Sequence, residues 1–365
     1  MGVFVVILTK GTIDGSIEML IGNSIRLSSG HVRIIDREYQ VKERLLSLNY
    51  PVDGFGGEGY RAMVEVLGSI DSVENVVPRL RFGAMVSKGA ELEGVMAMGV
   101  DPEPEDKLVG FSRYLSDGRF LQPGERGAVM GYRTLDKLGL DVGDKFTLVF
   151  NTALGSLKGY TFTVVGSVKS GVQYLDDGLV FVPLDVAQDM LDMGPAVTEI
   201  LVMAKDEAQV PGMSREIQQM LRARGADTRY LAEPWYQHGE MFRALETAKG
   251  AYNLVYFFIL FLASFVVVNT MVMIINERRR EIGMMSALGL RPDEIRQLFM
   301  CEGGVMGVLG SFIGVLAGAG VLKVLSVAGI AMPGTSSIDK AFMMPPKLYP
   351  EFSLEVIGFA FLAGI

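Results

Sequence analysis

Few residues of this chain have the types and spacing that enzyme chemistry needs. The two histidines, His31 and His238, lie far apart, with no cysteine or carboxylate at ligand spacing beside them, so no metal site is predicted. The acidic run DPEPEDK at 101–107 is predicted to be a solvated turn rather than a pair of carboxyl groups poised for acid–base catalysis. No stretch reads G-x-x-x-x-G-K-[ST], the loop that cradles ATP phosphates. We therefore predict no catalytic residue, no metal and no cofactor, with any ATP bound by another chain.

The stretch NERRREIGMMSALGL at 276–290 suggests a docking surface instead. Three consecutive arginines, residues 278–280, stand between two glutamates directly behind an uncharged run. Positive charge at the end of a membrane span anchors the topology of a chain, which is one explanation of this cluster. However, Ile282, Met285 and Leu288 recur at helical spacing, and exposed apolar residues on such a helix need a partner to cover them. A second short helix is predicted to begin at Pro292.

The segment in front of this stretch is predicted to be a transmembrane helix. Residues 251–275 carry no charge over about 25 positions, which at about 1.5 Å per residue crosses a hydrocarbon core about 30 Å thick. A second uncharged run, 303–322, is rich in glycine. The segment 352–365, which carries one charge at Glu355, is otherwise apolar up to the last residue, as if cut inside a helix. The first residues, MGVFVVIL, are too short to span and are interpreted as the end of a first transmembrane helix.

The composition fits a membrane protein. Of the 365 residues, 49% are hydrophobic, and the mean hydropathy of +0.32 exceeds that of ordinary soluble proteins. A formal charge of −8 argues against a nucleic-acid-binding protein, because no broad basic face offsets the acidic residues. The single cysteine, Cys301, excludes an internal disulfide and is interpreted as a packing residue.

The arginine cluster also predicts the orientation of the chain. Positive charge near helix ends favours the cytoplasm, so the loop behind residue 276 is predicted to be cytoplasmic. The region of about 200 residues before position 251 must then lie on the opposite side of the membrane. The proline-containing loop at 331–351 is expected on that same external side, without regular structure.

The external region is predicted to fold as mixed α and β structure. Short β-branched or alternating runs bounded by Gly, Asp or Pro predict strands at 31–36, 144–150, 160–168, 177–184 and 198–205. Apolar residues three and four apart predict helices at 59–70, 133–139, 184–191 and 214–225. Two flanking apolar stripes predict a paired helical stalk, with Ile13, Ile17, Leu20, Ile21 and Ile25 in one helix and Met241, Leu245 and Ala248 in the other.

These elements give an expected layout for the whole chain. Its first part comprises the end of a first transmembrane helix with an amphipathic stalk at 1–29, the external α+β domain at 30–237 and a returning stalk helix at 238–250. The second part comprises a transmembrane helix at 251–276, a cytoplasmic helix and loop at 277–300, a third transmembrane helix at 301–328, an external loop at 329–351 and the start of a fourth transmembrane helix at 352–365.

Glycines recur through the predicted third transmembrane helix. Several of them form G-x-x-x-G pairs, which let helix backbones approach closely. The glycines in question are Gly303, Gly307, Gly310, Gly314 and Gly318. The spacing predicts helix packing, and it leaves open whether the partner helix belongs to the same chain or to a second subunit.

Two groups of motifs, taken together, resemble a known family. The first is NERRREIGMMSALG followed by RPDEIRQLFMCEGGVMGVLGSFIG; the second, in the external region, comprises SSGHVRI, MGVDPEPE, LGLDVGDKFTLVF and GLVFVPLDVAQDML. They resemble the FtsX-like ABC transporter permeases, the group that includes MacB and the lipoprotein-release permeases LolC and LolE. The resemblance covers nearly the whole chain. It implies an α-helical transmembrane bundle of four spans and a mixed α+β extracytoplasmic core domain like that of MacB.

The resemblance also implies a role for the arginine stretch. In the family this segment is a coupling helix that docks on an ABC ATPase, in which charged groups give orientation and apolar groups supply burial. The contact would be carried here by Glu277, Arg278, Glu281, Ile282 and Gly283. Further partners implied are a second permease subunit, identical or different, and the membrane. The implied location is the bacterial inner membrane, crossed several times, with the large domain in the periplasm.

Among the branches of the family, GVDPEPE and the lack of a fused ATPase look most like the lipoprotein-release permeases. The cargo would then be a lipoprotein, extracted from the inner membrane and passed to a periplasmic carrier for delivery to the outer membrane. One alternative is an efflux or peptide-export permease of the MacB kind. Another is FtsX-like signalling across the membrane to cell-wall hydrolases, and an external hydrolase domain has the least support.

Overall fold

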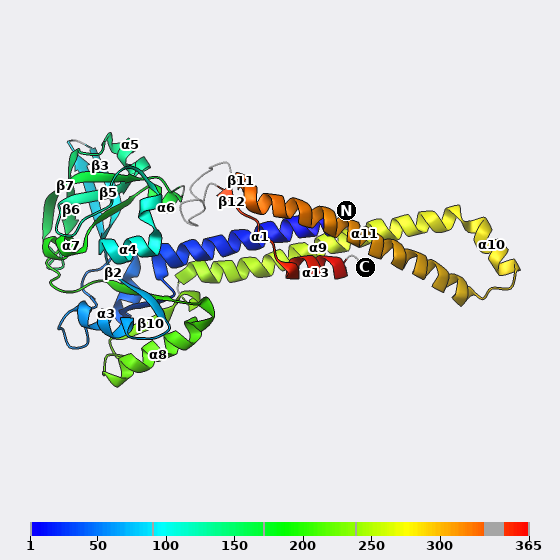
Figure 1. Ribbon diagram of the computed structural model, residues 1–365, viewed down its shortest axis with the longest axis horizontal. Coiled ribbons are helices and arrows are strands. Elements are labelled where there is room, and N and C mark those ends of the chain that lie inside the picture. The colour runs from blue at the N-terminus through cyan, green and yellow to red at the C-terminus, as the bar shows by residue number, and fades with distance from the viewer. Residues whose placement is uncertain (1, 90, 171, 238, 332–346, 364–365) are drawn as a thin grey trace. The chain divides into compact units, whose positions relative to one another are not determined.

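The computed structural model describes residues 2–89, 91–170, 172–237, 239–331 and 347–363. Its described residues form two compact units: residues 20–242, and the combination of 2–19, 243–331 and 347–363. The first contains all the long strands and is called the α/β unit, whereas the second consists almost entirely of helices and is called the helical unit (Figure 1).

One half of the α/β unit is a four-stranded antiparallel sheet with the strand order β10-β1-β9-β2. Along the chain its elements alternate as two β-α-β units, and α3 and α8 pack against the sheet. This is the split β-α-β arrangement of ferredoxin-like folds. Its elements are β1 (Val32–Asp36), α3 (Tyr60–Gly68), β2 (Val73–Lys88), β9 (Glu199–Ala204), α8 (Val210–Ala223) and β10 (Tyr230–Pro234).

The other half is a ring of strands inserted between β2 and β9. Strand pairing runs β2-β3-β8-β5-β7-β6 and then returns to β2, so the ring closes, and β4 adds to the outside of β7. Closure removes exposed strand edges. The added strands are β3 (Glu91–Val100), β4 (Leu115–Gly118), β5 (Gly127–Gly131), β6 (Lys145–Asn151), β7 (Leu157–Val168) and β8 (Leu179–Pro183).

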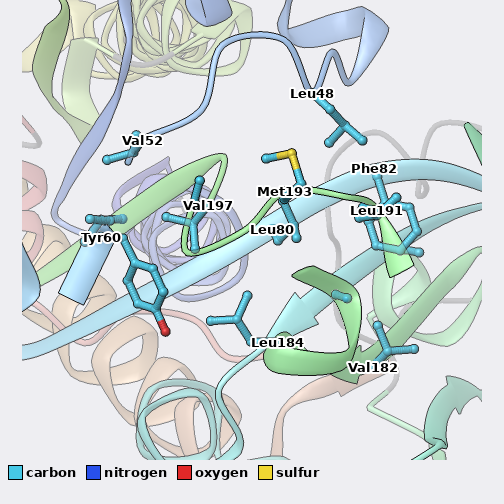
Figure 2. Packing of buried hydrophobic residues seen from close by; sticks show 14 of the residues in the cluster. Leu48, Val52, Tyr60, Leu80, Phe82, Val182, Leu184, Leu191, Met193 and Val197 are labelled. Atoms are coloured by element: carbon cyan, nitrogen blue, oxygen red, sulfur yellow. The ribbon is translucent and has the colours of Figure 1, made fainter. Parts of the chain in front are cut away.

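A single strand joins the two halves. The first part of β2 pairs with β9 from Val73 to Arg79, and its later part pairs with β6 from Ala84 to Ser87. One core of buried side chains extends across both halves. Figure 2 shows Leu80 and Phe82 of β2 among residues from β8, α7 (Leu184–Met190), the segment 191–197 that follows α7, and the segment 48–60. Each fully buried side chain of this size contributes about 1.5–3 kcal/mol to folding.

Short helices complete the α/β unit. They are α2 (Arg37–Lys42), α4 (Pro102–Val109), α5 (Tyr132–Leu138) and α6 (Gln173–Asp176), with short 3-10 turns at 43–45, 111–113, 207–209 and 235–237. Where α4 lies, the sequence predicted a solvated turn, and that prediction was wrong. Asp101 stands at the N-cap and Pro102 opens the helix, which places Glu105 on its buried side.

The strands expected at 31–36, 144–150, 160–168, 177–184 and 198–205 correspond to β1, β6, β7, β8 and β9, and the four expected helices correspond to α3, α5, α7 and α8. The β2–β3 hairpin, β4, β5 and β10 were missed. Strand β2 is buried continuously through its middle, including Arg79 and Arg81, because it has the sheet on one side and the ring on the other. Such a strand has no alternation of polar and apolar residues to reveal it.

The helical unit contains two helices that are long and apolar enough to cross a membrane, over 250–277 and 292–328, by length and composition. The elements here are the first part of α1 (Gly2–Ser24), α9 (Gly239–Glu277), α10 (Arg279–Ala287), α11 (Pro292–Ala328), the two-residue strands β11 (Ile330–Ala331) and β12 (Lys347–Leu348), and α13 (Leu354–Ala363). A π-helical turn, Ile25–Ser29, follows α1.

Two expectations about this unit change. The short helix predicted at Pro292 and the apolar helix predicted over 301–328 form one continuous helix, α11, so the prediction of a separate short helix was wrong. Cys301 is exposed rather than packed. Of the two expected stalk stripes, Ile17, Leu20 and Ile25 are buried. The side chains of Met241, Leu245 and Ala248, His238 and most of the loop at 329–351 lie outside the described residues.

Candidate functional site

The helix α10 is the candidate docking site. Residues that leave the helical conformation separate it from α9 at one end and from α11 at the other. Helix α9 ends at Glu277, and Arg278 leaves the helical conformation before α10 begins. At the far end, Gly289 adopts a φ of +98°, which favours glycine. The amides of Gly289 and Leu290 donate to the carbonyls of Ser286 and Met285 at 3.1 and 3.2 Å, which closes the end of α10.

The first residues of α11 hold the far end of the short connection between α10 and α11. Pro292 occupies the first turn of α11, where its missing N–H costs nothing. The amide of Arg291 donates to the Glu294 carboxylate at 2.8 Å. Arg278 forms an ion pair with Glu302 of α11 at 3.0 Å. The sequence therefore builds a short, separate helix between two long apolar ones.

The residues expected to carry the contact are arranged unequally on α10. Glu277, Glu281 and Gly283 are exposed, and Arg278 is exposed but paired with Glu302. Ile282, expected to be the main apolar contact, is half-buried. Their role in docking stays a prediction.

Two apolar side chains of this segment are largely exposed. Met284 is 61% exposed and Leu288 is 83% exposed. The helical spacing of the apolar residues indicated Leu288 but not Met284. Met284 and Met285 are adjacent and both apolar, so the sequence does not show which of the two side chains points outward. Exposed apolar groups beside the arginines give the composition of a protein-docking surface, with burial at its centre and charge around it.

The glycines of α11 make contacts within this chain. A Cβ added to Gly314 would lie 3.1 Å from Val3, one added to Gly318 would lie 3.1 Å from Ile7, and one added to Gly303 would lie 2.6 Å from Met271. These glycines therefore allow α11 to approach α1 and α9 closely. Gly307 is half-buried, and a Cβ at Gly310 would meet no described atom within 4 Å.

A buried ion pair in the α/β unit was missed by the sequence reasoning. Arg79 of β2 and Glu105 of α4 are 1% and 0% exposed, and their nearest charged atoms are 2.6 Å apart. The same guanidinium donates to the carbonyls of Leu27 and Arg26 at 2.7 and 3.1 Å. Arg79 thereby fastens the turn that follows α1 to the core. An acidic residue within the DPEPED run was the available signal, but its apolar neighbours Leu108 and Val109 were not weighed with it.

A second buried cluster of charges holds the segment after β1 over the sheet. Arg33 is fully buried and bonds Glu43 at 2.6 Å and Glu233 at 3.0 Å, while Glu199 lies 3.4 Å away. Burial alone would lower the pKa of Arg33, but the bond to Glu43 and the surrounding carboxylates raise it. The described residues contain no group of three or more side chains that could hold a metal ion. His31 instead accepts a hydrogen bond from the Ala204 amide through Nδ1 at 2.9 Å.

Comparison with known families identifies the chain. Residues 1–220 match the family described as the MacB-like periplasmic core domain, and residues 253–365 match the FtsX-like permease C-terminal family. The chain belongs to the MacB-like periplasmic core family. The resemblance seen in the sequence motifs is therefore confirmed, and residues 20–220 of the MacB-like match lie in the α/β unit.

Individual relatives of this MacB-like protein are identical to it at about a quarter of the aligned positions. The lipoprotein-releasing system transmembrane protein LolC of Neisseria meningitidis serogroup B is 26% identical, over 64% of this chain and 58% of the relative. The macrolide export ATP-binding/permease protein MacB of an Azoarcus species is 27% identical, over 55% of this chain and 30% of the relative. A solved extracellular domain of the noncanonic ABC-type transporter YknZ has a TM-score of 0.41 and 13% identity, over 55% of this chain and 98% of that one.

Proposed function

We propose that this chain is the non-catalytic permease subunit of an ABC transporter whose ATPase is a separate chain. The observation that carries the proposal is the match of residues 253–365 to the FtsX-like permease C-terminal family, in a segment where α10 stands between two long apolar helices. In this proposal ATP is bound by the partner; residues 1–365 contain no phosphate-binding loop. The complete protein would cross the bacterial inner membrane four times, with residues 30–237 in the periplasm.

In this proposal α10 and its flanks receive the motion of the ATPase. Glu277, Arg278, Glu281, Ile282 and Gly283 form the expected contact, with charged groups setting orientation and apolar groups supplying burial. The exposure of Leu288 and Met284 adds an apolar centre that the sequence reasoning assigned to Ile282. The long helices then carry the displacement toward the periplasmic domain, and the Arg79–Glu105 pair, with its bonds to Leu27 and Arg26, keeps that domain from slipping against the end of α1.

We further propose that the cargo is a lipoprotein, removed from the inner membrane by a dimer of permease subunits and passed to a periplasmic carrier. The support is the likeness to LolC, whose name describes lipoprotein release. The likeness to MacB favours a second candidate, export of small molecules or peptides. FtsX-like signalling to cell-wall hydrolases is the third candidate function, and the tests must distinguish it from lipoprotein release and from export.

The coupling proposal is tested by the double variant Glu281→Lys, Gly283→Trp. Both positions are exposed, and a Cβ added at Gly283 meets no described atom within 4 Å, so a side chain can leave the backbone there without a clash at its Cβ. The charge reversal and the bulk should abolish co-purification with the ATPase subunit while membrane insertion is unchanged. The matched control, Glu216→Lys on the exposed side of α8, should leave the association intact. Undiminished co-purification of the double variant would rule out α10 as the docking site.

The cargo proposal is tested by depleting the full-length protein in its native host. Labelled lipoproteins are followed between the inner and outer membrane fractions. Accumulation in the inner membrane is the expected result. Normal sorting with impaired efflux would favour export, and normal sorting with altered cell-wall cleavage would favour signalling; either result would leave the ATPase-coupled permease proposal standing.

A further inference from the structure

The helical unit contains a cavity of about 580 Å³ lined by α1, α9 and the start of α13. Its lining combines charged groups with aromatic and apolar ones. Lys10 and Asp14 come from α1, and Glu351 and Glu355 come from the end of the chain. Neither the docking surface of α10 nor the contacts of the α/β unit use this cavity.

The charges of the lining are unbalanced, with one cation among three carboxylates. Lys10 Nζ bonds Asp14 Oδ2 at 2.8 Å, and among the residues that the structure describes, neither Glu351 nor Glu355 has an ion-pair partner. Burial raises the pKa of the Glu351 carboxyl, and the carboxylates of Glu18 and Asp14 raise it further. The cavity therefore has an excess of negative charge that a cation would relieve.

An unpartnered polar group lies in the same lining. Tyr256 is 5% exposed, and its hydroxyl has no hydrogen-bond partner among the described residues. A buried hydroxyl without a partner carries a desolvation penalty of about 1–3 kcal/mol, which a bound donor would offset. The Lys10 ammonium lies 5.6 Å from the centre of the Tyr256 ring, so this wall already holds one alkylammonium by charge and by contact with a ring face.

The lining is also suited to an organic cation more than to a bare ion. Phe257, Val356 and Phe359 contribute apolar side chains to the same lining as the carboxylates. The volume is many times that of a single ion, and the described residues contain no group of three or more side chains able to hold a metal. Aromatic rings beside carboxylates are the surroundings in which organic ammonium groups bind.

We propose that this cavity binds an organic ammonium group that carries an apolar tail. The ammonium lies beside Glu351 and Glu355 and donates to the Tyr256 hydroxyl, and the tail lies against Phe257 and Phe359. Two sources supply this chemistry, the headgroup of an aminophospholipid and a water-soluble alkylamine. The proposal does not depend on the cargo or on ATPase docking.

The test uses the full-length protein in detergent, with bound lipid counted by native mass spectrometry and alkylamine binding followed by thermal shift. The probes are phosphatidylethanolamine, phosphatidylglycerol and hexylammonium. Glu351→Gln should weaken binding of phosphatidylethanolamine about tenfold or more, and Tyr256→Phe, which removes only the hydroxyl, should weaken it by a smaller factor. Glu216→Gln, an exposed carboxylate on α8, is the matched control and should change nothing. Glu355→Gln replaces Glu351→Gln if that variant does not fold.

The arms of the experiment distinguish the two sources. One phosphatidylethanolamine per chain, lost in Glu351→Gln, supports the lipid headgroup. Binding of hexylammonium with the same dependence on Glu351, without retained lipid, supports a soluble amine. Equal retention of phosphatidylglycerol, or binding of both amines that is unchanged in Glu351→Gln, would overturn the proposal. ATPase co-purification of these variants reports separately on the proposed function and is expected to be unaffected.

Discussion

Two arginine–glutamate pairs in this protein have the same chemistry and opposite surroundings. Arg79 and Glu105 are 1% and 0% exposed and lie 2.6 Å apart. Arg278 and Glu302 are 46% and 30% exposed and lie 3.0 Å apart. The first pair joins a strand, a helix and the turn after α1, whereas the second only steadies the entrance to α10. Burial, more than the residue types, decides what such a pair does.

The physical reason is the cost of leaving a charge without its partner. Inside the protein a lone guanidinium has no water to solvate it, so removing one member of a buried pair costs about 3–5 kcal/mol. At the surface water replaces the lost partner, and exposed pairs contribute about 0–1 kcal/mol. The buried pair is therefore structural, while the exposed pair leaves α10 free to meet another protein.

The largest expected effect follows from breaking the buried pair. Glu105→Gln leaves the Arg79 guanidinium buried without a counter-charge, which should destabilise the α/β unit by about 3–5 kcal/mol. The unfolding midpoint of the full-length protein in detergent should fall by about 10 °C.

The control for this variant is Glu103→Gln in the same helix. Glu103 is 79% exposed and pairs with Lys107 at 2.8 Å, so its replacement should change the free energy of unfolding by no more than about 0.5 kcal/mol. Replacing both buried partners, as Arg79→Met with Glu105→Leu, should recover part of the stability because no charge is left buried. Equal midpoints for the Glu105 and Glu103 variants would contradict the structural role of the pair.

An intermediate effect is expected at the apolar part of the exposed region. If Leu288 is buried against an ATPase, Leu288→Ser removes about 2 kcal/mol of binding, which weakens association about thirtyfold. Ile282→Ser should weaken it less, because Ile282 is already half-buried within the chain. The measurement is titration of the purified ATPase onto the full-length protein.

Leu154→Ser is the matched control for this titration. Leu154 is 79% exposed, close to the 83% of Leu288, but it lies in the turn between β6 and β7. Its replacement should leave the affinity unchanged. If Ile282→Ser lowers the affinity for the ATPase more than Leu288→Ser does, Ile282 is the main apolar contact, as the sequence suggested.

The smallest expected effect is that of breaking the exposed pair. Arg278→Gln should change stability by less than about 1 kcal/mol, a shift of about 2 °C or less in the unfolding midpoint. Addition of 0.5 M salt should remove most of that small difference, since salt screens exposed charges. A loss of stability as large as that caused by Glu105→Gln would show that burial does not account for the difference between the two ion pairs.

The sequence predicted those elements whose pattern is local. Strand β6 alternates buried and exposed side chains, and α8 places Met213, Ile217 and Leu221 on one buried face, so both were found from their periods. Strand β2 and helix α4 were missed because their polar residues are buried as partners of each other. The identity of Glu105 as a buried residue depends on Arg79, which lies 26 positions earlier in the chain.

The candidate docking site was predicted in part. The position of α10 follows from the arginines behind an uncharged run, Gly289 at its end and Pro292 beyond it, all of which are local signals. Which side chains face outward does not follow from them. Ile282 and Leu288 are both apolar and helically spaced, yet in the fold Ile282 is half-buried and Leu288 is exposed.

The sequence by itself determined the apolar helices, the short helix between them and the family motifs, because each depends on composition, periodicity or residues adjacent along the chain. Only the tertiary structure decided which charges are buried, that the glycines at 314 and 318 face α1, and that Lys10, Tyr256 and Glu351 line one cavity. These features join residues far apart in sequence. Their energies arise from the removal of water around groups that folding brings together. The local sequence pattern does not indicate which groups will lose their water.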